Sequence, residues 1–103
     1  LPYYLSVGVS KAALEAVTRY LAVELAPRGI NVNAVAGGLV ETEALQHFPN
    51  REAMLTQAKD KTPDNRLVSA DDIAKAVYFL CGEEASMIRG QVIVVDGGMS
   101  LIG

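Results

Sequence analysis

The sequence predicts an α/β protein, the C-terminal portion of a doubly wound and mostly parallel sheet. Helical segments alternate with short apolar strands along the 103 residues. A long helical connection separates the two strands, as parallel pairing requires. The composition, 50% hydrophobic and 20% charged, is that of an ordinary globular protein. Two strands cannot form such a sheet alone, so we expect residues 1–103 to be the C-terminal part of a single domain whose N-terminal half is absent.

The first helix and strand are predicted over residues 9–26 and 30–36. Apolar side chains recur in the helix at three- and four-residue steps, at Leu14, Val17, Leu21 and Leu25. Pro27 to Gly29 should end this helix, because glycine is the usual residue beyond a helix terminus. Residues 30–36 are rich in branched side chains, which favours a strand. Gly37 and Gly38 then mark a tight turn or a close approach of the backbone to a ligand.

Residues 42–66 differ in character, because prolines punctuate them and few apolar positions align. A short helix is expected over 42–48, and Asn50 should cap a second helix that runs to Lys61. We interpret the whole segment as an excursion over the surface.

The last helix and strand carry the clearest signals. Ser69 should cap a helix over 69–82, with acidic residues in its first turn near the positive end of the dipole. Its predicted buried stripe consists of Ile73, Ala76, Val77 and Leu80. Residues 91–95 form a continuous apolar run, typical of a parallel strand buried on both faces. The turn at 96–98 (Asp-Gly-Gly) closes that strand and is expected to be structural.

Charge and cysteine content exclude several classes of function. A net charge of −3 argues against general nucleic-acid binding, which would require a basic stripe. The apolar runs are too short to cross a bilayer. A single cysteine, Cys81, cannot form an internal disulfide, which fits a cytoplasmic protein. No cluster with metal-ligand spacing occurs, and His47 is interpreted as a surface histidine.

Tyr4 and Lys11 are the residues best suited to acid chemistry. Six residues separate them, so in a helix the two side chains would lie roughly two turns apart on one face. A nearby ammonium stabilises the phenolate and lowers the pKa of a tyrosine toward a useful range. The alternative is a structural tyrosine with an unrelated surface lysine.

Four segments occur in an order and spacing that mark a known family: SKAAL at 10–14, RGINVNAV at 28–35, GLVET at 38–42 and GQVIVVDGG at 90–98. They resemble the C-terminal half of a short-chain dehydrogenase/reductase with a Rossmann-type sheet. Most of that family has its tyrosine at the position of Val7 and a proline at the position of Gly37. The longer gap, the glycine pair and residues 47–52 look like bacterial enoyl-acyl-carrier-protein reductase III.

This resemblance implies roles for individual residues. Tyr4 would donate to the thioester oxygen, and Lys11 would bind the nicotinamide ribose. The remaining cofactor-binding residues would be Gly37, Gly38, Leu39, Val40 and Thr42. NADPH is favoured by the resemblance over NADH. The alternative for residues 37–40 is a purely structural strand-to-helix turn capped by Thr42.

Residues 42–66 would form the substrate-binding lid, with Leu45, Phe48 and Met54 offering apolar surface to an acyl chain, although plain packing is the alternative. The implied substrate is an enoyl thioester on acyl carrier protein in bacterial fatty-acid biosynthesis, and the implied assembly is a homotetramer. Another short-chain reductase, such as a 3-oxoacyl-acyl-carrier-protein reductase, and a non-catalytic fragment are the competing hypotheses.

Overall fold

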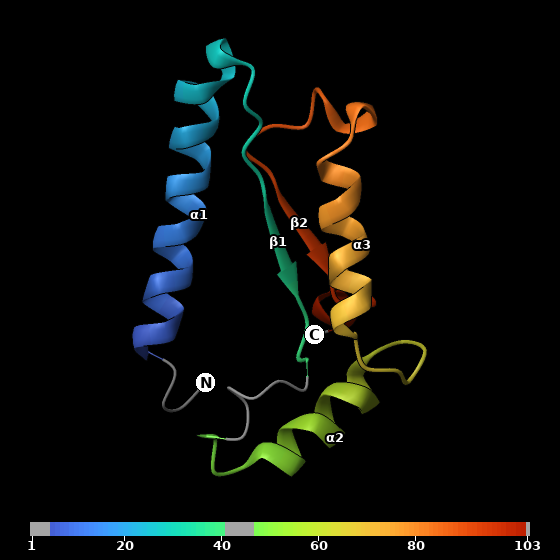
Figure 1. Cartoon of the computed structure of the whole chain (residues 1–103). Helices are drawn as coiled ribbons and strands as arrows, with labels where there is room; N and C mark the ends of the chain where they lie inside the picture. Colours follow the sequence, from blue (N-terminus) through green and yellow to red (C-terminus); the bar gives the residue numbers. More distant parts are fainter. Residues whose placement is uncertain (1–4, 41–46, 103) are drawn as a thin grey trace. The chain divides into compact units, whose positions relative to one another are not determined.

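The computed structural model describes residues 5–40 and 47–102, which divide into two compact units. The first unit comprises residues 1–34 and 79–93, and the second comprises 35–78 and 94–103. Within these described ranges, one α-helix precedes β1, two α-helices connect β1 to β2, and the two strands are adjacent and parallel in one sheet (Figure 1). The predicted α/β class with a parallel sheet is therefore confirmed.

Helix α1 spans Leu5–Leu25 in the first unit, so it begins earlier than the predicted residue 9. A 3-10 turn, η1 (Ala26–Arg28), follows it, and Gly29 then adopts a left-handed conformation with φ 77°. The N–H of Gly29 donates to the carbonyl of Ala26 at 2.9 Å, which satisfies one of the free carbonyls at the helix end. The predicted stop at 27–29 is thus confirmed.

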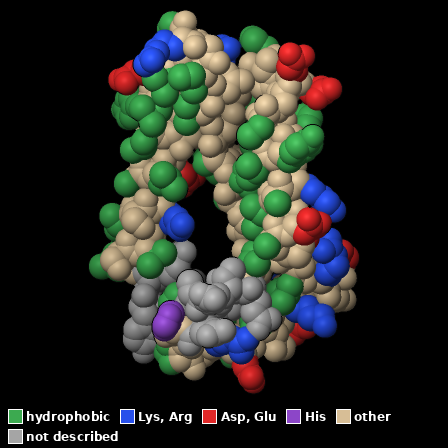
Figure 2. Space-filling model, viewed as in Figure 1, with side chains coloured by type: hydrophobic (Ala, Val, Ile, Leu, Met, Phe, Trp, Pro, Cys, Tyr) green, Lys and Arg blue, Asp and Glu red, His purple; other side chains and the backbone are tan. Residues whose placement is uncertain are grey.

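The buried positions of α1 are small or polar. Thr18 and Ala22 are buried, and the hydroxyl of Thr18 donates to the carbonyl of Leu14 at 2.8 Å. Larger apolar side chains are exposed, among them Tyr20 at 73% and Val23 at 75%. Figure 2 shows apolar side chains at the surface along this helix. The apolar pattern therefore predicted the helix without indicating which of its residues would be buried.

Strand β1 spans Ala34–Gly37, so the predicted strand over 30–36 was placed too early. The cause is Asn31, whose side-chain amide donates to the carbonyl of Ser86 at 3.0 Å. Its oxygen also accepts a bond from the Arg89 guanidinium at 2.7 Å. Side-chain bonds therefore hold Asn31 in place before regular strand pairing begins.

Asn33 acts in the same way, immediately before β1. Its amide donates to the carbonyl of Ile88 at 2.8 Å, and its oxygen accepts from the N–H of Gln91 at 3.0 Å. Between the two asparagines, the carbonyl of Val32 accepts from Gly90 at 2.8 Å. Ladder pairing begins only where the N–H of Ala34 donates to the carbonyl of Gln91.

In the second unit, α2 spans Arg51–Lys61. This confirms the helix predicted after Asn50, although the Asn50 side chain makes no capping bond. Thr62 follows the helix and is buried, with its hydroxyl donating to the carbonyl of Ala58 at 2.8 Å. The helix predicted over 42–48 falls mostly outside the described residues.

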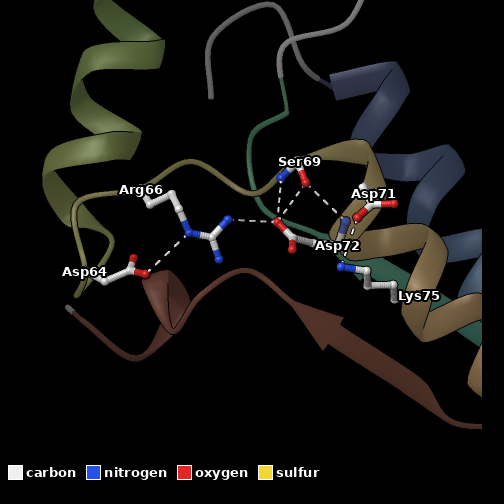
Figure 3. A network of polar contacts seen from close by, with 6 residues as sticks. All are labelled: Asp64, Arg66, Ser69, Asp71, Asp72 and Lys75. Atoms are coloured by element: carbon white, nitrogen blue, oxygen red, sulfur yellow. Dashed lines mark hydrogen bonds and ion pairs between the residues drawn. The ribbon is translucent and has the colours of Figure 1, made fainter.

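Helix α3 spans Ala70–Leu80 and has the predicted cap. The Ser69 hydroxyl accepts from the N–H of Asp72 at 3.1 Å, and the Asp72 carboxylate accepts from the N–H of Ser69 at 2.9 Å. This reciprocal pairing is a capping box. The same carboxylate oxygen accepts from the hydroxyl of Ser69 and from Arg66 at 3.0 Å, and Arg66 also lies 3.5 Å from Asp64 (Figure 3).

Two predictions of burial were wrong. Val77 on α3 is 45% exposed, whereas its stripe neighbours Ile73, Ala76 and Leu80 are half-buried. Strand β2 spans Val92–Val95, and Val94 is 55% exposed although the run was expected to be buried on both faces. A sheet of two strands brings too little apolar surface together to cover these side chains.

The capping carboxylate of Asp72 should make stability depend on acid pH. Bonds from Ser69, and then from Arg66, lower its pKa from 3.8 to about 2. Its contribution is therefore complete above about pH 5 and is lost as the pH falls from about 4 through about 2. In urea unfolding of the full-length protein, the midpoint difference between wild type and Asp72→Asn should shrink over that window. The exposed Asp71→Asn variant is the control, and a pH-independent difference for Asp72→Asn would contradict the assignment.

Candidate active site

The structure describes part of the predicted site. Lys11, residues 37–40, Phe48 and Met54 are described, whereas Tyr4, Thr42 and Leu45 lie outside the described residues. Lys11 belongs to the first unit and the others to the second, so each group is described within its own unit.

Lys11 is exposed on α1, which continues without interruption through Gly8 and Val7. The hydroxyl of Ser10 donates to the carbonyl of Val7 at 2.7 Å and so adds a side-chain bond to this turn. Among the described residues, no ion pair involves Lys11.

The glycine pair ends β1 and packs tightly against the protein. A Cβ on Gly37 would lie 2.5 Å from Cδ1 of Ile73, closer than real Cβ contacts allow. A Cβ on Gly38 would lie 3.2 Å from Cβ of Asp96 and 3.6 Å from Cγ2 of Val68. Protein atoms therefore lie where a Cβ would point at both glycines. Their predicted contact with the nicotinamide stays a prediction.

The other described candidates are partly accessible. Leu39 and Val40 follow the glycine pair, and both are half-buried. Phe48 is half-buried ahead of α2, as is Met54 on that helix, while His47 is exposed. Their predicted roles toward a cofactor and an acyl chain stay predictions.

The sequence predicts Asp96 only as a structural residue of a turn, whereas in the structure its carboxylate is buried and hydrogen-bonded. It is 8% exposed, and its carboxylate accepts from the N–H groups of Gly98 at 2.8 Å and Ser100 at 3.0 Å. Hydrogen bonds from the Ser100 side chain and from these amides lower the pKa of Asp96. The signal was present in the sequence, because aspartate before two glycines favours an Asx turn.

The first unit has an open groove of about 670 Å³ that is bordered by Arg19 of α1 and by Arg89. None of the predicted site residues lines it. The described residues contain no group of three or more His, Cys, Asp or Glu placed to hold a metal ion. Of the helices that the structure describes, none has the length and apolar character needed to span a membrane.

The family defined as enoyl-(acyl carrier protein) reductase matches residues 1–100. The chain belongs to this family. The 1-cyclohexenylcarbonyl-CoA reductase of Streptomyces collinus is 45% identical, covering 98% of this chain and 37% of the relative. The enoyl-[acyl-carrier-protein] reductase [NADH] of Escherichia coli K12 is 37% identical, covering 98% and 38% respectively.

Solved structures of the family have the same fold. The enoyl-[acyl-carrier-protein] reductase (NADH) of Aquifex aeolicus VF5 is 32% identical with a TM-score of 0.92, covering 100% of this chain and 40% of that one. The predicted Rossmann-type short-chain reductase fold is thereby confirmed. The chain spans less than half the length of these relatives. The names of two of them specify NADH, so the preference for NADPH is not confirmed.

The packing at Gly37 predicts a steric defect that a second substitution should relieve. Its φ lies outside the left-handed region, so Gly37→Ala should lose stability, by about 1–3 kcal/mol, only through the clash with Ile73. Ile73→Val removes Cδ1 and leaves Cγ1, which lies 3.3 Å from the new Cβ. Urea unfolding of the full-length double variant should therefore show a smaller loss than the sum of the single variants. If the stability losses of the two single variants simply add, Ile73 is not the residue with which the new Cβ clashes.

Proposed function

We propose that the full-length protein reduces the carbon–carbon double bond of an enoyl thioester with a nicotinamide cofactor. The observation that carries this proposal is the family match over residues 1–100, together with the six-residue gap between Tyr4 and Lys11. Both relatives quoted above by sequence are named for reduction of a thioester that carries a double bond next to its carbonyl.

When bound, the nicotinamide cofactor would supply hydride to the β-carbon of the substrate. Negative charge then develops on the thioester oxygen, and the hydroxyl of Tyr4 donates to that oxygen and stabilises it. Lys11 holds the cofactor ribose through its ammonium and lowers the pKa of the tyrosine through its positive charge. The exposed position of Lys11 on α1 supports this role. The α-carbon of the enolate would finally take a proton from water.

The loop after β1 is the proposed contact for the nicotinamide carboxamide. Val40 supplies its backbone amide and carbonyl, and Thr42 supplies a hydroxyl. Gly37, Gly38 and Leu39 shape the path of the backbone between β1 and Val40. NADPH is the proposed reductant on the resemblance to the type III enzyme, whereas the relatives named for NADH support the other nucleotide. Comparing the KM of the full-length enzyme for the two nucleotides decides between them.

Acyl carrier protein is the proposed carrier of the substrate, as in the name of the Escherichia coli relative. The name of the Streptomyces collinus relative specifies a coenzyme A thioester instead, so both carriers belong in the assay. Leu45, Phe48 and Met54 would contact the acyl chain. The full-length protein is proposed to be a homotetramer. It would act in the cytoplasm, in bacterial fatty-acid biosynthesis.

The choice between double bond and ketone can be tested with two substrates of equal chain length. The full-length protein should oxidise NADPH or NADH in the presence of a crotonyl thioester and leave an acetoacetyl thioester largely unreduced. Product analysis by mass spectrometry should show the saturated butyryl thioester. Reduction of the ketone alone would replace this proposal with a 3-oxoacyl reductase, and turnover of neither substrate would favour a non-catalytic protein.

The role of Tyr4 can be tested against its neighbour. Tyr4→Phe removes only the donor hydroxyl, so kcat of the full-length enzyme should fall about 10²–10⁴-fold, the usual range for an acid group. Tyr3→Phe is the matched control and should leave kcat nearly unchanged. Lys11→Met should both lower kcat and raise the KM for the nucleotide. Equal rates for Tyr4→Phe and wild type would remove Tyr4 from the mechanism.

A further inference from the structure

Three close contacts in the second unit meet at one short turn, Asp96–Gly97–Gly98, here called the DGG turn. The carboxylate of Asp96 bonds the N–H groups of Gly98 and Ser100 and so holds the turn closed. Gly97 and Gly98 have φ values of 65° and 91°, which other residues rarely adopt. The turn is thus fixed by one buried carboxylate and two glycines.

On one side, the DGG turn supports the loop after β1. The N–H of Gly38 donates to the carbonyl of Val95 at 3.2 Å, directly before the turn. A Cβ on Gly38 would lie only 3.2 Å from Cβ and 3.4 Å from Cα of Asp96. The two backbones therefore lie close together and share a hydrogen bond next to the turn, so a shift of Asp96 should displace Gly38 as well.

On the other side, the turn supports the C-terminal end of α2. A Cβ on Gly97 would lie 2.8 Å from Cγ2 of Thr62, and one on Gly98 would lie 3.2 Å from Cγ of Pro63. Thr62 is 4% exposed and bonds back to Ala58 inside α2. The end of this helix therefore has the backbone of the DGG turn as a direct neighbour.

We propose that the DGG turn is a rigid joint that sets the position of the nicotinamide-binding loop relative to the end of the substrate lid, with Asp96 as its positioning residue. This inference rests on the proposed function. Asp96 itself touches neither substrate nor cofactor. It acts through Gly38 on the loop and through Gly97 on Thr62, so it holds the loop at a fixed position relative to the end of α2.

Asp96→Asn tests the joint, because an amide keeps one acceptor oxygen and places an N–H₂ group against a backbone N–H. Hydrogen–deuterium exchange of the full-length protein should accelerate about tenfold at the amides of Gly38 and Thr62. Exchange of the other protected amides should change less, and Asp71→Asn, on a 74% exposed side chain, should change neither reporter. Acceleration that is equal at all protected amides, or none at Gly38 and Thr62, would overturn the proposal.

Steady-state kinetics distinguish a positioning role of Asp96 from a role in stability alone. At a temperature well below its unfolding midpoint, Asp96→Asn should raise the KM for the nucleotide about tenfold, with a smaller effect on kcat. Unchanged KM in a variant with accelerated exchange would confine Asp96 to a structural role and contradict the inference. If the wild-type protein binds neither nucleotide, the proposed function fails, while the exchange experiment still shows whether the joint exists.

A suppressor pair tests the contact with α2 directly. Gly97→Ala should displace Thr62, both through its φ of 65° and through the 2.8 Å approach, and should accelerate exchange at Thr62 and at Gly38. Thr62→Ser removes the methyl group and retains the hydroxyl that bonds Ala58. The double variant should recover part of the protection at both amides. Recovery at neither amide, or at Thr62 alone, would show that the turn does not connect them.

Discussion

Unpaired backbone groups next to the two strands are the constraint on which this structure depends. A partly buried N–H or carbonyl, such as those of Ile88, Gly98 and Ser100, costs about 1–3 kcal/mol without a partner, and side chains supply partners where the ladder stops. In the first unit, Asn31 and Asn33 supply them to residues 86–91. In the second unit, Asp96 supplies them to the turn after β2. Three short polar side chains thus hold the segments that the sheet leaves open.

How much could be predicted from the sequence depended on how local each signal was. Ser69 and Asp72 lie three residues apart and bond each other, so the start of α3 was predicted correctly. Asn31 and Asn33 bond residues more than fifty positions away, which no local pattern reveals, and the strand was therefore placed too early. The continuous apolar run likewise predicted the strand at 91–95 without showing that Val94 would be 55% exposed, because exposure depends on what else covers the strand.

For the candidate site, the sequence identified the residues but did not show why each residue type is required at its position. Glycine at 37 and 38 indicated close approach of the backbone to something, and a cofactor was the partner that the family resemblance supplied. The structure shows protein atoms in the direction of both missing Cβ atoms. One glycine can both pack against the protein and approach a cofactor, since the direction in which a Cβ would point and the peptide group face different neighbours. The bonds of Asp96 are local, to Gly98 and Ser100, but its burial was missed because it packs next to Gly38, far away in the chain.

The spacing between donor and lysine bears on which bond is reduced. When a ketone is reduced, the carbon that receives hydride also carries the oxygen, whereas in an enoyl thioester the oxygen lies two carbons farther along the chain. A donor for the thioester must therefore lie farther from the transferred hydride. Val7 precedes Lys11 by four residues, a helical rise of about 6 Å. Because α1 is continuous from Leu5 through Val7 to Lys11, the nearer position carries an apolar side chain that cannot donate. With Val7 at the nearer position, the six-residue gap between Tyr4 and Lys11 favours a donor that lies farther from the transferred hydride, as the thioester oxygen requires.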